Sequence, residues 1–231
     1  MDALFPLILV GGLTLVGLVG YLSWRADQKR RQLLQGFAAS SGWTYTPRDD
    51  SWTERFEGMP FGQGDHRRAD NVLAGRYGER DMVAFDYSFQ THSTDGKGNS
   101  STTTHRSTVC ALRLQAYLPD LELSPESVLT RMAGAVGFAD VELESEDFNR
   151  RYRVKARIPK FAYDVLNPRT MTALLARRPL HLRIRGADAL CWEDGRLQPA
   201  ELMERLSTLA LLVDGIPSFV WSDHSPGGAT A

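Results

Sequence analysis

The sequence is poor in cysteine, which excludes a disulfide scaffold and a cysteine-rich metal centre. Cys110 and Cys191 are the only two cysteines in 231 residues, and each lies in an apolar run typical of a strand. Their spacing matches no zinc-ligand pattern. We expect two buried thiols in a reducing compartment, where a disulfide is disfavoured.

The chain also lacks an excess of charge of one sign. It carries 27 basic and 28 acidic side chains, and its formal net charge is −1. Proteins whose main partner is a nucleic acid usually contain a strongly basic domain. We therefore predict that nucleic acid is not a partner of this protein.

Sequence signatures of catalysis are missing as well. The chain has no nucleophile elbow, no Ser-x-x-Lys motif and no Cys–His pattern. We assign no catalytic residue, no cofactor, no cofactor-binding residue and no metal ligand. The sequence favours a binding protein over an enzyme.

One long stretch, residues 3–24, has no charged side chain. About 20 apolar residues in an α-helix cross the hydrocarbon core of a bilayer, so we predict a transmembrane anchor over residues 1–24. The run is too long for a cleaved signal peptide, and its basic flank follows it instead of preceding it. By the positive-inside rule, the C-terminal domain then faces the cytoplasm from a single-pass span in the plasma membrane. The predicted membrane-flanking residues are Tyr21, Trp24, Arg25, Lys29, Arg30 and Arg31.

The rest of the chain is long enough for one α+β domain of antiparallel strands with segregated helices. A juxtamembrane helix is predicted over residues 25–41, because Ser40, Ser41 and Gly42 end the helical pattern. The soluble domain covers 42–221 and a disordered tail covers 222–231. A C-terminal amphipathic helix is expected from Pro199, with one apolar face formed by Leu202, Leu206, Leu209 and Val213.

The first half of the domain is rich in strand signals. Residues 47–70 are expected to be irregular, with aromatic side chains as plugs. Alternating Val83, Phe85, Tyr87 and Phe89 predict a half-buried antiparallel strand. The Ser/Thr/Gly-rich residues 92–106 are expected to form a mobile hairpin tip, followed by a strand at 108–115. We predict a connector over 119–123 and a helix from Ser124, an N-cap hydroxyl before a proline, to about Gly137.

In the second half, two segments alternate charges of opposite sign. Acidic side chains alternate over residues 140–144, and basic side chains alternate over 151–157. A hairpin with its turn at 145–149 brings these charges together and fixes the register. The expected pairs are Glu144 with Arg151, Glu142 with Arg153 and Asp140 with Lys155. Farther on, two strands at 180–185 and 189–193 are expected to meet at a turn that contains Gly186.

His92 and His105 flank the predicted hairpin tip and are the first candidate site. If the hairpin closes, the two imidazoles together with Asp86 or Asp95 are suitable ligands for a metal. A zinc site needs rigidly held ligands, so solvated histidines are the favoured interpretation.

Three other groups of charged residues were weighed in the same way. Gly62-Gln63-Gly64 before His66-Arg67-Arg68 has the glycines and charge of a phosphate cradle but lacks a P-loop ending, which favours a plain surface loop. An acidic group is better explained as a salt-bridged face than as a cation site: Glu142, Glu144, Glu146 and Asp147. A basic group fits either anionic lipid headgroups or internal pairing, with pairing favoured: Arg151, Arg153, Arg183 and Arg185.

Two sets of motifs resemble an uncharacterised bacterial family of membrane-anchored proteins, of the type found in actinobacteria. The C-terminal half is similar to the family in its LES-x-x-F and L-x-P-x-x-M motifs: Leu143, Glu144, Ser145, Phe148, Leu166, Pro168 and Met171. The N-terminal half follows the same order of short motifs: Gly42-Trp43-Thr44-Tyr45, Pro60-Phe61, Gly75, Arg80, Ala84-Phe85-Asp86-Tyr87, Leu118-Pro119, Leu121 and Pro125-Glu126. The resemblance implies an anchored domain and supplies no activity and no catalytic residue.

From these observations we expect a membrane-anchored cytoplasmic domain that binds a protein or the membrane surface. The bilayer is the expected partner, and a protein partner or a second copy of the chain stays open. The alternative is an envelope-associated enzyme or metal-binding protein with a site near residues 92–105.

Overall fold

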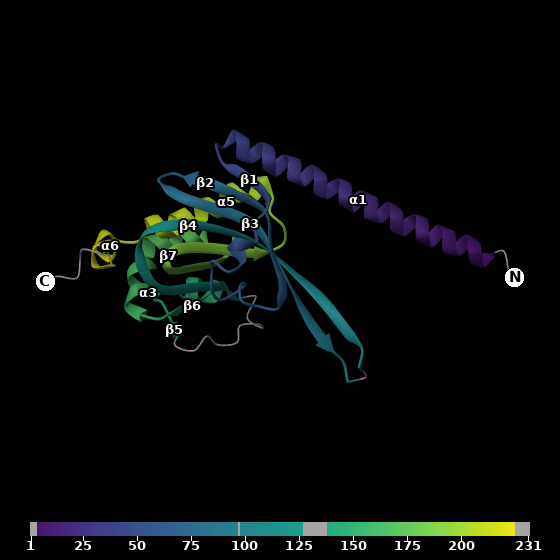
Figure 1. Ribbon diagram of the computed structural model, residues 1–231. Helices are drawn as coiled ribbons and strands as arrows, with labels where there is room; N and C mark the ends of the chain where they lie inside the picture. The colour runs from purple at the N-terminus through teal and green to yellow at the C-terminus, as the bar shows by residue number, and fades with distance from the viewer. Residues whose placement is uncertain (1–3, 97, 127–137, 225–231) are drawn as a thin grey trace.

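The computed structural model describes residues 4–96, 98–126 and 138–224, with side chains from residue 17 onward. It has an α+β architecture in which helices pack on an antiparallel sheet (Figure 1). The elements in chain order are α1 (Leu4–Ser40), β1 (Thr44–Arg48), the 3-10 helix η1 (Asp50–Thr53), β2 (Asp65–Tyr77), β3 (Arg80–Thr94), β4 (Ser100–Pro125), β5 (Ala139–Val141), α2 (Glu146–Arg151), β6 (Tyr152–Ala156), α3 (Pro159–Val165), α4 (Pro168–Leu175), β7 (His181–Asp194), α5 (Pro199–Asp214) and α6 (Ser218–His224).

The strands form one sheet in the order β1-β2-β3-β4-β6-β5, and β7 pairs with β4 off this path. The described pairings are antiparallel. Strand β4 is long enough to serve two neighbours on one edge, first β3 and then β6, while β7 lies along its other edge. Register shifts between Arg113 and Leu121 mark where β4 changes neighbours, as bulges do when they bend a strand.

Alternation along β3 sends successive side chains into two different cores. Met82 and Ala84 belong to the main core, which the sheet forms with helices α1, α3, α4, α5 and α6. Phe85 and Tyr87 belong to a second core on the other face, which residues 49–64 cover with aromatic side chains. Both the alternating strand and the aromatic plugs are confirmed.

Helix α1 is continuous over 37 residues, about 55 Å at 1.5 Å per residue. It ends at Ser40, before Gly42 at φ 71°, which confirms the predicted end. Only its C-terminal part packs on the body, through the buried Leu34 and Ala38. Across the residues described, no helix combines the length and hydropathy that a membrane span requires. The anchor predicted for residues 1–24 falls largely on positions whose side chains lie outside the described part, and it stays a prediction.

The hairpin predicted to have a mobile tip is instead a regular ladder. Pairing between β3 and β4 continues outward to Thr94 opposite Ser100, so only a short turn joins the strands. Hydroxyl groups also bond across the ladder, as between Ser93 and Ser101 at 2.7 Å. Threonine is β-branched and favours strands, so a segment without apolar groups still extends the sheet. In Figure 1 this hairpin and the N-terminal end of α1 both extend beyond the body toward the right of the view.

The helix predicted to begin at Ser124 is wrong at its start. Ser124 and Pro125 are the last residues of β4, opposite Arg153 and Tyr152 of β6. The connector predicted over 119–123 is likewise part of β4. A serine followed by a proline has only a local preference for starting a helix, and pairing with β6 overrides that preference. The remainder of that predicted helix, residues 127–137, lies outside the described residues.

The charged hairpin is confirmed in pairing and in part of its register. Strands β5 and β6 are antiparallel, with Asp140 opposite Lys155, but β5 ends at Val141. The predicted turn at 145–149 is wrong, because helix α2 begins there with the Ser145 hydroxyl accepting from the Phe148 N–H. Arg151 lies in this helix and therefore cannot oppose Glu144. Ser145 and Phe148, which make this capping contact, both belong to the LES-x-x-F motif, and Phe148 is fully buried.

Two predictions near the C-terminus need correction. The turn predicted at Gly186 is wrong, because Gly186 lies inside a single strand, β7, opposite Leu118, where the extra residues on β4 form the bulge. Its φ of +59° lets β7 follow the bend of β4. The tail predicted over 222–231 is wrong at its start, because helix α6 continues to His224, and residues 225–231 lie outside the described part.

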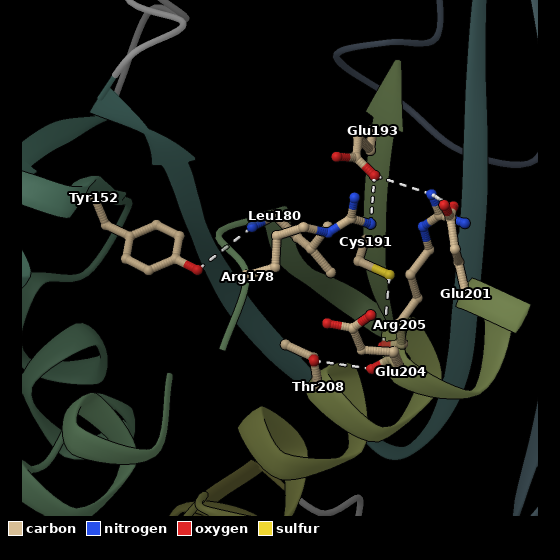
Figure 2. A network of polar contacts seen from close by, with 9 residues as sticks. All are labelled: Tyr152, Arg178, Leu180, Cys191, Glu193, Glu201, Glu204, Arg205 and Thr208. Atoms are coloured by element: carbon tan, nitrogen blue, oxygen red, sulfur yellow. Dashed lines mark hydrogen bonds and ion pairs between the residues drawn. The ribbon is translucent and has the colours of Figure 1, made fainter. Parts of the chain in front are cut away.

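Helix α5 begins at Pro199 as predicted, and its four apolar residues face the main core. An ionic network around the buried Arg205 joins it to β7 (Figure 2). Arg205 donates to Glu193 at 2.9 Å and to Glu201 at 2.7 Å, and Arg178 meets the same oxygen of Glu193 at 2.8 Å.

Beneath this network, Cys191 lies directly opposite Cys110 of β4. Both cysteines are free and fully buried, as the sequence predicted. A side-chain hydrogen bond in which the Cys191 thiol donates to Cys110, together with burial, raises the pKa of Cys191 well above its usual value, so its thiol stays protonated at neutral pH.

Candidate functional site

A polar groove of about 780 Å³ opens between helix α1 and the base of the β3–β4 hairpin. We call it the arginine groove. Its walls come from α1, β1, β2, β3, β4 and the turn after β7, which are far apart in the sequence. The lining residues are Asp27, Arg30, Arg31, Arg48, His66, Arg67, Arg68, Asp70, Asn71, Asp86, Tyr87, Ser88, Phe89, Gln90, Thr104, Arg106, Gly195 and Arg196.

The arginine groove is the outward continuation of the main core along β3. Ala84 faces that core, and the next residues on the same face are Asp86, Ser88 and Gln90, which line the groove. The main core ends at this point because Arg30 and Arg31 lie on the N-terminal side of the buried Leu34 in α1. Polar side chains therefore replace apolar ones as the sheet extends past the helices.

Asp86 is the centre of the groove floor. One carboxylate oxygen accepts from Arg30 at 2.6 Å and from the Asn71 side chain at 2.7 Å. The other oxygen accepts from the Leu197 backbone N–H at 2.6 Å. Three donors surround the Asp86 carboxylate and compensate its negative charge. The bond from Arg30 also holds α1 against the sheet.

Asn71 takes part because β2 carries a bulge at its position. Its φ is +53°, in the left-handed region that asparagine tolerates better than most residues, and the register with β3 shifts between Asp70 and Leu73. Its side-chain oxygen accepts from the Tyr45 hydroxyl at 2.8 Å. Burial raises the pKa of Tyr45, so this hydroxyl remains a proton donor across the physiological range.

The glycine-rich segment before β2 brings its basic residues into the groove. Gly64 has a φ of +52°, and a Cβ there would lie 2.0 Å from the Gln90 carbonyl oxygen, so the close approach requires glycine. His66, Arg67 and Arg68 follow directly and line the groove. The segment interpreted as a plain surface loop is therefore part of the candidate site.

Seven arginines and three aspartates line the groove, which leaves a positive excess. Several of these arginines already have partners: Arg30 bonds Asp86, Arg48 pairs with Asp50, Arg67 with Glu54 and Arg196 with Asp27. Arg68 approaches Asp70 at 4.0 Å. Arg31 and Arg106 have no ion-pair partner among the residues that the structure describes.

The predicted membrane-flanking residues divide into two groups. Tyr21 and Trp24 are exposed and stacked at 6.3 Å, and the Arg25 guanidinium lies 5.9 Å from the Tyr21 ring. Lys29 is exposed too, whereas Arg30 and Arg31 line the groove. Before and between these two aromatic residues, α1 exposes more than half of each large apolar side chain described: Leu18, Val19 and Leu22.

His92 and His105 do not come together. His92 lies opposite Thr102 and His105 opposite Phe89, three positions apart on the ladder, which is about 10 Å and places them on opposite faces. His92 bonds Asp65 at 3.1 Å, while His105 stacks on Phe89 at 4.7 Å. Within the described ranges, no three potential ligands cluster for a metal ion. The metal site suggested for His92 and His105 is therefore not assembled among the described residues.

The other candidate residues do not form a site. In the acidic group, Glu142, Glu144, Glu146 and Asp147 are exposed. Within the described residues only Asp147 has an ion pair, with Arg150, so the salt-bridged face expected for this group is confirmed for one acid of the four. The basic group bonds internally, which confirms the favoured interpretation over contact with anionic lipid headgroups. Arg153 meets Asp140, Arg185 meets Asp120, Arg151 bonds the Arg177 carbonyl and Arg183 is buried.

Sequence reasoning missed Arg106, Asn71 and Arg196 as groove residues. Each is an isolated polar residue in a strand or turn, and nothing in its neighbourhood distinguishes it from a solvated side chain. Only the glycine-rich segment with Arg67 and Arg68 carried a recognisable signal.

Comparisons with known proteins give a likeness of fold. No family model and no curated protein matches the sequence. The crystal structure of the mycobacterial trehalose monomycolate transport factor A, TtfA, superimposes with a TM-score of 0.62. It has 14% sequence identity and covers 81% of this chain and 96% of that chain. At this identity the likeness establishes the fold alone, and the motif-based family resemblance stays a prediction.

Proposed function

We propose that this protein is a membrane-anchored binding module that works at the cytoplasmic surface of the cell envelope membrane. In this proposal residues 3–24 span the bilayer, and the α+β domain presents the arginine groove to the lipid surface. The protein acts by binding and carries out no chemical reaction.

The apolar surface of α1 is the observation that carries the proposal. Leu18, Val19 and Leu22 are more than half exposed on a helix that leaves the body. Exposed apolar surface of this extent is unfavourable in water at about 25 cal/mol per Å², and lipid would cover it. Tyr21 and Trp24, next along the helix, suit the interface between lipid and water.

The structural likeness supports the envelope part of the proposal. TtfA is named as a factor for the transport of trehalose monomycolate, and its fold covers most of this chain. A module with the same fold and an apolar N-terminal helix fits a supporting role in a membrane-bound process. We infer neither the same cargo nor the same partners.

Extraction of membranes from cells expressing the full chain tests the anchor. Wild-type protein should stay in the membrane pellet after alkaline carbonate treatment. Leu18→Glu combined with Val19→Glu should move the protein to the supernatant, because each acid costs about 2–3 kcal/mol within the hydrocarbon and less near its edge.

The matched control places the same two charges on the same helix beyond the proposed span. Leu33→Glu with Gln35→Glu alters exposed positions beside the body and should leave the protein in the pellet. Release of the wild-type chain by carbonate would refute the anchor. Cleavage of the hairpin at 92–106 by protease added outside intact cells would refute the cytoplasmic orientation.

A further inference from the structure

We propose that the arginine groove binds the phosphate group of an anionic phospholipid headgroup that carries hydroxyl groups. The inference rests on the proposed membrane anchor, because the anchor fixes the source of the ligand. It adds a ligand class and named binding residues to that function.

The unpaired cations of the groove are the first observation. Arg31 from α1 and Arg106 from β4 have no ion-pair partner in the described chain. Arg68 from β2 has a long ion pair, with 4.0 Å between its guanidinium and Asp70. Three guanidinium groups from three elements thus face one space. Guanidinium groups bind phosphate oxygens through paired, charge-assisted hydrogen bonds, which gives this arrangement a chemical preference.

The paired groups of the groove explain why the positive charge is not cancelled. Asp86 is neutralised by Arg30, Asn71 and the Leu197 N–H. Asp27 is paired with Arg196. The acids therefore hold the walls in place, and an incoming anion meets little repulsion from them.

The uncharged lining indicates what accompanies the phosphate. Ser88, Gln90 and Thr104 border the cavity and offer hydroxyl and amide groups to a hydroxylated partner. The volume of about 780 Å³ falls within the range of small-molecule sites, roughly 300–1,000 Å³. A polyol phosphate such as the headgroup of phosphatidylinositol fits this chemistry, with its acyl chains remaining in the bilayer.

The position along α1 places the groove at the outer edge of the headgroup layer. Arg31 follows Trp24 by seven residues, which is about 10 Å on a helix. The polar layer on each side of a bilayer is about 5–8 Å thick, from a total of ~40–45 Å and a core of ~30 Å. A groove that begins just beyond the interfacial belt can therefore reach a headgroup without removing the lipid.

Calorimetric titration of the full-length protein in nonionic detergent tests the inference. The probes are glycerophosphoinositol, inorganic phosphate and free inositol. The wild-type protein should bind glycerophosphoinositol most tightly, inorganic phosphate more weakly and inositol not measurably. Arg31→Gln combined with Arg106→Gln should weaken binding of glycerophosphoinositol on the order of 100-fold, about tenfold for each charge-assisted contact.

The matched control removes two exposed arginines outside the groove, Arg150→Gln with Arg169→Gln, and should change the affinity by no more than about twofold, because solvent screens remote charges. Equal losses in the two double variants would reduce the effect to bulk charge and overturn the site. Undiminished binding by the Arg31/Arg106 variant would overturn it as well.

Three further results complete the test of this inference. Inorganic phosphate binding as tightly as glycerophosphoinositol would overturn a lipid headgroup as the ligand. Thermal unfolding of the Arg31/Arg106 variant should match that of wild type, since neither side chain has an ion pair to lose. Carbonate extraction of the same variant should still find it in the pellet, so loss of headgroup binding is distinguishable from loss of the anchor.

Discussion

Arginines in two regions of this protein have opposite surroundings. In the body, Arg183 and Arg205 are almost fully buried, and each meets several acceptors. Arg183 donates to the Glu57 and Met59 carbonyls at 2.5 and 2.6 Å and lies 4.7 Å from the Trp192 ring, while Arg205 joins two glutamates (Figure 2). In the arginine groove, Arg31 and Arg106 are exposed and without ion pairs in the described chain.

Burial therefore determines the role of an arginine in this protein. A buried guanidinium must have its partners within the fold, because leaving it or them unpaired away from water costs several kcal/mol. An exposed guanidinium is solvated, so it needs no partner for folding and stays available for a ligand. The body arginines are therefore expected to determine stability, and the groove arginines to determine binding.

The largest expected effect is at Arg183. Its replacement by alanine should lower the free energy of unfolding by about 3–5 kcal/mol, because Glu122 and two backbone carbonyls lose their partner in a buried place. Urea denaturation followed by tryptophan fluorescence measures the loss. Arg113→Ala removes an exposed partner of Asp188 and should cost less than about 1 kcal/mol. Similar losses at both positions would break the comparison.

Asp86 joins the two regions, and its replacement by alanine should have the next largest effect. We expect a loss of about 2–3 kcal/mol, since Arg30, Asn71 and the Leu197 N–H lose a common acceptor that is only partly exposed. Asp81→Ala on the same strand alters an exposed acid 4.0 Å from Arg76 and serves as the control. A stability equal to wild type for the Asp86 variant would contradict a structural role of the groove floor.

His181 provides a pH-dependent test of burial in the body. Its ring stacks on Trp192 at 4.9 Å, and burial, with Arg183 nearby, lowers its pKa to about 4. The unfolded chain, with a histidine pKa near 6.5, then binds the proton more readily than the folded protein does. Stability should therefore fall as pH decreases below about 6.5, by about 2 kcal/mol between pH 7 and pH 5.

The measurement is the difference between wild type and His181→Phe, which keeps an aromatic ring against Trp192. The change in the urea midpoint between pH 7 and pH 5 should be smaller for the variant than for wild type. The same pH dependence in both proteins would assign the effect to other groups.

The smallest expected effect on stability is at the groove rim. Arg31→Gln and Arg106→Gln should each change the free energy of unfolding by less than about 0.5 kcal/mol, because each side chain is exposed and lacks an ion pair in the described chain. Thermal denaturation of the full-length variants measures this. A loss comparable to that at Arg183 would show that these side chains are structural.

Much of the secondary structure followed from local patterns. The end of α1 before Gly42, the alternating strand at Val83–Phe89 and the start of α5 at Pro199 match the structure. Each depends on residues within a few positions of one another. The Asp140–Lys155 pair was also predictable, because two complementary charge alternations allow few registers.

The misplaced elements share one physical cause. Ser124-Pro125 is a good helix start by propensity, yet both residues end β4, where pairing with β6 outweighs a local preference of about 1 kcal/mol. The Ser/Thr ladder of the hairpin likewise forms because a neighbouring strand is present. Local sequence does not contain the information on which strand that is.

The candidate site was predictable only in fragments. The basic cluster after Trp24 and the segment with Arg67 and Arg68 were recognised, but as two unrelated features. Asp86 was considered as a metal ligand, whereas the structure gives it to Arg30. The chain contains many arginines and many acids, and their separation in sequence does not show which arginine pairs with which acid. Their partners could therefore not be assigned from the sequence.

An α+β chain with an apolar N-terminal helix, a basic flank and two buried thiols follows from the amino-acid sequence, because these features arise from the periodicity and hydropathy of neighbouring residues. The meeting of Arg30 and Arg31 with Arg68 and Arg106 at one groove follows from the folded chain. Strand pairing and the bulge in β2 bring these residues together over long separations, and burial then selects which charges are paired. The physical reason is that the partner of a charge depends on its distance and solvation in the folded protein, and a linear pattern specifies neither.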